Sequence, residues 1–157
     1  MAKSRAARTI LIAGLVAGTL DITYACVFSY IRRGVKPIAV LQSVAGGALG
    51  REAATAGGIR TAALGLFFHF LIALIFASFY YLASRVIRFM ITHPIISGIL
   101  YGLCVYLVMY GIVLRVSAIH STTLPWAYPW PVLIGNLSIH MFGIGLSIAL
   151  VTRKFSR

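Results

Sequence analysis

Long apolar stretches, separated by short polar or basic segments, dominate the pattern of this chain. Four of them reach the roughly 20 residues that a helix needs to cross the hydrocarbon core of a bilayer. They cover residues 9–31, 61–84, 95–116 and 131–151. We therefore expect an all-α fold, an integral membrane bundle of four transmembrane helices forming one domain over residues 1–157. An even number of spans places both ends of the chain on the same side of the membrane.

A fifth apolar stretch, residues 37–50, lies between the first two spans and is too short to cross a bilayer. Its size is typical of a re-entrant or an interfacial helix. Pro37 suits the first turn of such a helix, and the pair Gly46-Gly47 would weaken or end it. If the segment re-enters the bilayer, Gln42 and Ser43 could reach the interior of the bundle.

Small residues recur at helical spacing on the first and third spans, as Gly14 and Gly18 and as Gly98 and Gly102. A Gly-x-x-x-Gly pair lets two helices approach closely, so we expect these glycines to mark helix-packing faces. Asp21 shares the face of Gly14 and Gly18 by helical periodicity, and it should therefore point at another helix.

The composition supports a membrane protein, because 61% of the residues are hydrophobic and only 10% are charged. The net charge of +12 comes from 14 Lys and Arg against two acids, Asp21 and Glu52. The basic residues lie at the ends of the apolar stretches, where they contact the lipid bilayer and its anionic headgroups, and this argues against a nucleic-acid partner. They are somewhat more frequent on the side of the termini, which favours cytoplasmic termini.

Ionisable and polar side chains fall at a common depth in all four apolar stretches. They are Asp21 on the first, His69 on the second, Tyr106 and Tyr110 on the third, and Asn136 and His140 on the fourth. Counted at about 1.5 Å per residue from the side of the 37–50 segment, Asp21 and the two histidines lie roughly 12 to 13 Å deep. Such groups are costly in hydrocarbon and are functional candidates, so we expect a polar layer inside the bundle.

Several interpretations of this layer are open. It is either a hydrogen-bonded network that fixes helix register or a protonation or small-ligand site, which could serve transport. The first alternative function is a structural or accessory subunit of a larger membrane complex, or a homo-oligomer, with its glycine-rich faces on partner helices. A third is a b-type haem protein with His69 and His140 as axial ligands. Zinc held by Asp21, His69 and His140 is a further hypothesis.

Catalytic motifs are missing from the sequence. It contains no Gly-x-Ser-x-Gly, no His-Glu-x-x-His and no phosphate-binding loop, and two acids leave little for carboxylate catalysis. The sequence therefore leans against an enzyme.

Short motifs in all four spans resemble those of a family of small bacterial inner-membrane proteins. They are Gly18-Thr-Leu-Asp21, Val40-Leu-Gln-Ser43, the stretch 63–73 around His69, Tyr101-Gly102 and Asn136-Leu-Ser-Ile-His140. The stretch 124–126, Leu-Pro-Trp, is more distantly similar to YagU-type membrane proteins. The resemblance implies a multi-pass protein of the bacterial inner membrane and carries no activity, substrate or cofactor with it. The motifs that carry the resemblance contain five candidate site residues, Asp21, Gln42, His69, Asn136 and His140.

Overall fold

The structure, a computed structural model, describes residues 2–155 and contains no strand in that range. Met1, Ser156 and Arg157 lie outside the described residues, and Arg157 is one of the basic residues behind the predicted orientation. The elements are α1 (Ala2–Arg33), α2 (Pro37–Leu49), α3 (Arg51–Ala56), α4 (Gly58–Val86), α5 (Phe89–Thr92), α6 (Pro94–Val108), η1 (Met109–Val113), α7 (Leu114–Val116), α8 (Trp130–Ser138), η2 (Ile139–Leu146) and α9 (Ser147–Phe155).

Four helical segments are long and apolar enough to cross a membrane. They run over Arg5–Arg33, Gly58–Val86, Pro94–Val116 and Trp130–Phe155, so each contains one predicted span and extends it by a few residues. The first two are α1 and α4, the third is α6, η1 and α7, and the fourth is α8, η2 and α9. The predicted all-α bundle with four membrane-spanning helices is confirmed.

The third and fourth spans each contain a π-helical segment, η1 and η2, which the sequence did not predict. In a π-helix each backbone N–H bonds to the carbonyl five residues back, so the turn is wider than in an α-helix. Such segments are rare and are frequently found at functional sites. Both carry a residue of the predicted polar layer, Tyr110 on η1 and His140 on η2.

The predicted short apolar helix between the first two spans is α2, which packs along α4. It ends before Gly50, whose φ of 81° is readily adopted only by glycine. Gly46 and Gly47 lie inside the helix and do not end it. Gly65 permits the close approach of α4, because a Cβ at this position would overlap the Leu41 carbonyl oxygen.

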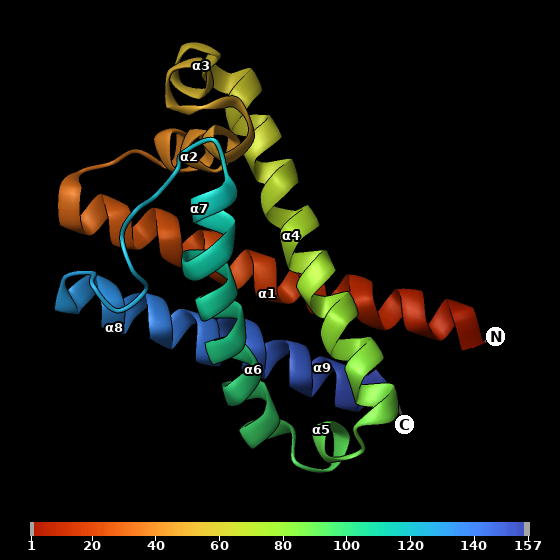
Figure 1. The fold of residues 1–157 in the computed structure, drawn as a ribbon. Helices are drawn as coiled ribbons and strands as arrows, with labels where there is room; N and C mark the ends of the chain where they lie inside the picture. Colours follow the sequence, from red (N-terminus) through yellow and green to blue (C-terminus); the bar gives the residue numbers. More distant parts are fainter. Residues whose placement is uncertain (1, 156–157) are drawn as a thin grey trace.

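The predicted packing glycines lie at two helix crossings, Gly14 and Gly18 where α1 meets α4, and Gly98 and Gly102 where α6 meets η2. A Cβ on Gly14 would come within 3.0 Å of the Leu74 Cα, and a Cβ on Gly102 would overlap the His140 carbonyl oxygen. Figure 1 shows α1 and the fourth span side by side and running in opposite directions, with α4 and α6 crossing them.

The two sides of the bundle differ in their connections. Figure 1 places α5 and both ends of the chain on one side and α2 and α3 on the other. On the α2 side, the Ala118 N–H donates to the Gly47 carbonyl over 2.8 Å, which ties the third connection to α2. Trp126 and Trp130, near the start of the fourth span, are 67% and 74% exposed. Exposed tryptophans at a span end are typical of the membrane–water interface.

The side of the termini is closed by a packed group of side chains, here called the closed core. Its fully buried members are Ala13, Ala17, Ala77, Tyr80, Ile148 and Ala149. The Tyr80 hydroxyl donates to the Met90 carbonyl at 3.0 Å and lies 2.9 Å from the Ser97 Oγ. These contacts link the second span to α5 and α6, so the closed core joins three elements at this end.

Replacing Gly102 by alanine should destabilise the protein by about 1–3 kcal/mol, the usual cost of overpacking a tight contact. The new Cβ would overlap the His140 carbonyl oxygen and push α6 away from η2. Gly111→Ala is the matched control on the same span, because its Cβ would lie 3.6 Å from the Pro125 side chain, an ordinary contact. Thermal unfolding in detergent compares the two variants, and equal stability would contradict the tight crossing.

Candidate functional site

A cavity of about 540 Å³ lies inside the bundle and reaches the side that carries α2. Its volume is in the range of small-molecule sites. All four spans and α2 line it, and most of the wall is apolar. The polar members away from its outer end are Asp21, Tyr24, Ser29, Ser43, His69, Tyr110, Asn136 and His140.

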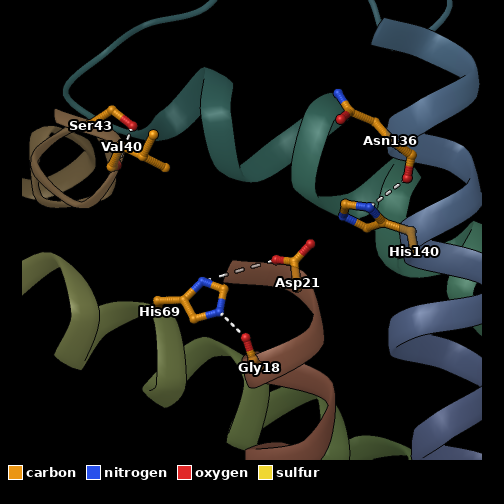
Figure 2. A network of polar contacts seen from close by, with 7 residues as sticks. All are labelled: Gly18, Asp21, Val40, Ser43, His69, Asn136 and His140. Atoms are coloured by element: carbon orange, nitrogen blue, oxygen red, sulfur yellow. Dashed lines mark hydrogen bonds and ion pairs between the residues drawn. The ribbon is translucent and has the colours of Figure 1, made fainter. Parts of the chain in front are cut away.

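Five residues of the predicted polar layer line this cavity, namely Asp21, His69, Tyr110, Asn136 and His140. They come from four different spans, so only the folded bundle brings them together. Figure 2 shows the Asp21 carboxylate extending into the space between the two histidines.

Gln42 and Tyr106, which were also predicted to belong to the site, do not line the cavity. The Gln42 amide donates to the Gly58 carbonyl at 3.0 Å and therefore links α2 to the start of α4. The Tyr106 hydroxyl donates to the Pro125 carbonyl at 2.5 Å, away from the cavity. Its ring packs edge-on against His140, with centroids 5.5 Å apart. Both residues hold neighbouring elements in position.

His69 makes two contacts with α1, and together they restrict where its protons lie (Figure 2). Nε2 lies 2.8 Å from the Gly18 carbonyl oxygen, and because a carbonyl only accepts, Nε2 carries a proton. Nδ1 lies 4.0 Å from Asp21 Oδ2. In a neutral ring Nδ1 would present a lone pair to the carboxylate, so a further proton on either group makes this contact attractive. The two contacts therefore fix the His69 ring between the Gly18 carbonyl and the Asp21 carboxylate.

His140 is 6% exposed, and its ring is fixed by its neighbours. Nδ1 donates to the backbone carbonyl of Asn136 over 2.8 Å (Figure 2). The rings of Tyr106 and Tyr110 lie edge-on to the imidazole at 5.5 and 5.8 Å between centroids. Because Nδ1 carries the proton, Nε2 of the neutral ring is an acceptor, and it has no hydrogen-bond partner among the described residues. The cavity therefore has a pre-oriented acceptor.

The polar groups of the cavity do not satisfy one another. Within residues 2–155, no hydrogen bond reaches the Asp21 carboxylate, the Asn136 side-chain amide or the Tyr110 hydroxyl. The Tyr24 hydroxyl is buried and likewise has no partner in the described part of the chain. Buried polar groups in proteins are nearly always hydrogen-bonded, to protein or to ordered water. The Asp21 carboxylate, the Asn136 amide and the Tyr110 hydroxyl can therefore bind water or a ligand, whereas the Tyr24 hydroxyl packs against Gly135 and is closed to the cavity.

The metal hypotheses find little support in this geometry. No group of three or more His, Cys, Asp or Glu within the described range is placed to hold a metal ion, so Asp21, His69 and His140 do not form the zinc site considered above. His69 Nε2 bonds to the Gly18 carbonyl, and Nδ1 lies beside the Asp21 carboxylate. Axial ligation of a haem by His69 would require breaking one of these contacts.

Several lining residues were missed by sequence reasoning, among them Tyr24, Arg32, Arg33 and Tyr128, whereas Ser43, which was expected to reach the interior with Gln42, does line the cavity. Tyr24 and Arg32 follow Asp21 by three and eleven residues, which places them on its helix face, so periodicity alone could have found them. Tyr128 lies on a connecting segment, and its position depends on how this segment folds back over the spans.

Comparison with known proteins identifies no relative, since no protein-family model, no curated protein and no solved structure matches this chain. The fold itself defines the class, a helical protein with four spans able to cross a membrane. The resemblance to small bacterial inner-membrane proteins stays a prediction.

Water should reach the cavity, and cysteine labelling tests this. In a chain whose Cys26 and Cys104 are replaced by alanine, Ala25→Cys should react with a neutral water-soluble maleimide, because Ala25 lines the cavity. Val27→Cys is the matched control two residues away, where the side chain is 52% exposed on the apolar outer surface and does not line the cavity. We expect the Ala25 thiol to react at least tenfold faster in lipid nanodiscs. Equal rates would mean that the cavity is dry.

Proposed function

We propose that this protein binds a small ligand in the cavity inside its membrane bundle, with Asp21 and His69 as the protonatable part of the site. The observation that carries the proposal is the open set of donors and acceptors around the cavity. We further propose a location in the bacterial inner membrane with cytoplasmic termini. The motif resemblance and the distribution of basic residues support that location.

The chemistry of the wall indicates what such a ligand must offer. At the level of the polar layer it meets the Asp21 carboxylate and the His140 Nε2, both of which accept hydrogen bonds. The Asn136 amide adds a group that can donate and accept. The rest of the wall is mostly apolar, with Ile72 and Phe76 among its members. A molecule with an apolar body and a hydrogen-bond-donating end complements this arrangement.

The Asp21–His69 contact links ligand binding to a proton. A ligand that donates a hydrogen bond to the carboxylate stabilises its ionised form, and a proton on His69 Nδ1 then completes an ion pair. When the ligand leaves, Asp21 and His69 either share one proton or bind water that enters the cavity. Binding and proton position are therefore coupled in this site, as proton-linked membrane proteins require.

Asp21→Asn should reduce the amount of bound ligand at least tenfold, because the carboxylate is the strongest acceptor of the cavity. The measurement is mass spectrometry of small molecules extracted from protein purified in mild detergent, with the wild type retaining a defined compound. Glu52→Gln is the matched control, since it removes the other acid of the chain and Glu52 does not line the cavity. If Asp21→Asn lowers only the midpoint of thermal unfolding and leaves the extract unchanged, the polar layer is structural.

Transport is a second candidate, favoured by the shape of the cavity. The lining residues reach one side of the bundle, while the closed core fills the other. A bundle that carried its ligand across the membrane would have to open this closed core in part of its cycle.

Ile148→Cys tests transport, because Ile148 is fully buried in the closed core and cysteine is smaller than isoleucine. In the background without native cysteines, transport predicts slow but complete labelling by the neutral maleimide from the side of the termini. A site that binds without transport leaves this thiol unreacted after Ala25→Cys is fully labelled. The second result would restrict the protein to binding.

A further inference from the structure

Two arginines stand at the outer end of the cavity without an acidic partner. Arg32 and Arg33 close α1 and contribute to the cavity wall, together with Val35 from the connection to α2, Ala39 from the start of α2 and Tyr128 from the segment before α8. Among residues 5–155, whose side chains the structure describes, neither guanidinium forms an ion pair, and the one ion pair joins His69 to Asp21. The outer end of the cavity is therefore cationic.

The wall between the arginines and Asp21 is one face of α1. Ala25, Phe28 and Arg32 follow Asp21 by four, seven and eleven residues, the spacing of a single helical stripe, and all four line the cavity. Eleven residues at 1.5 Å each place Arg32 about 16 Å along the helix from Asp21. The Arg32 guanidinium lies over the Phe28 ring, with 5.5 Å from Cζ to the ring centroid. The cavity is thus cationic at its outer end, apolar along the α1 stripe and polar at the level of Asp21, beyond which Phe76 and Ile144 line an apolar inner end.

We propose that the ligand is a single-chain amphipathic anion, whose carboxylate or phosphate binds Arg32 and Arg33 and whose chain lies along α1. This inference rests on the proposed function. Guanidinium groups bind such anions through paired, charge-assisted hydrogen bonds. The far end of the ligand carries a hydroxyl or similar donor, because Asp21 and His140 present acceptors there. A volume of about 540 Å³ suits one small molecule.

Anchoring to headgroups is the ordinary task of arginines at the end of a span. An arginine that anchors a span and an arginine that binds a ligand differ in where they lie. The anchoring arginine needs only to stand at the end of its span, as Arg115 on α7 does. Arg115 is exposed and does not line the cavity, although it lies at the same end of a span as Arg32. It therefore serves as the matched control for the two cavity arginines.

Protection of Ala25→Cys from the neutral maleimide tests the proposal, in phosphatidylcholine nanodiscs and in the background without native cysteines. ω-Hydroxydodecanoate and dodecyl phosphate should slow labelling, whereas dodecyltrimethylammonium, compared at equal membrane-bound concentration, should not. The Arg32→Gln/Arg33→Gln double variant should raise the half-protecting concentration of the anions at least tenfold. Arg115→Gln should leave it unchanged. The maleimide is uncharged, so the arginine substitutions do not alter its local concentration.

The outcomes separate this inference from the proposed function. Equal protection by the cationic amphiphile, or an unchanged double variant, would overturn the anionic ligand class while leaving a ligand-binding cavity in place. Protection by phosphatidylglycerol nanodiscs with no added amphiphile would identify a membrane lipid as the occupant and overturn the single-chain assignment. If no compound protects the Ala25→Cys thiol and Asp21→Asn also leaves the amount of extracted ligand unchanged, both this inference and the proposed function fail.

Discussion

The energetic penalty for a carboxylate at membrane depth is the constraint on which this structure depends. Hydrocarbon offers Asp21 neither water nor a counter-ion, so the side chain must face the interior of the bundle. The helix face that carries it is accordingly built from small residues, Gly14, Ala17 and Gly18, which bring α1 close to its neighbours. His69 then lies 4.0 Å from the carboxylate as the nearest ionisable partner.

The close helix contacts also account for the place of the cavity. Helices that cross in tight contact at one level diverge beyond it, and the crossings at Gly14 and Gly98 lie toward the closed core. On the other side of the crossings the spans separate, and α2 packs on α4 without filling the space. The polar layer lies at this transition. The same small residues that close one end of the bundle thus leave a cavity at the other.

Much of this arrangement follows from the sequence, and the remainder depends on the fold. Span lengths and residue depth bring Asp21, His69 and His140 to one level, because both follow from helical rise alone. Gln42 and Tyr106 were predicted to belong to the site, but depth does not say which way a side chain points, and both bond to backbone carbonyls outside the cavity. The π-helical segments have no signature in the hydrophobic pattern, since an apolar run reads alike in either helix type.

The distribution of contacts bears on whether the polar layer is structural. A network that fixed helix register would have its members bonded to one another across the spans. Here the register is fixed by glycine contacts such as that of Gly102 with the His140 backbone, and the side-chain bonds of His69 and His140 go to backbone carbonyls. These bonds orient the two imidazoles and leave the acceptor side of His140 toward the cavity. The His69 contacts join α4 to α1, whereas the His140 Nε2, the Asn136 amide and the Tyr110 hydroxyl bond to no other described span, and we infer that these free groups serve a ligand.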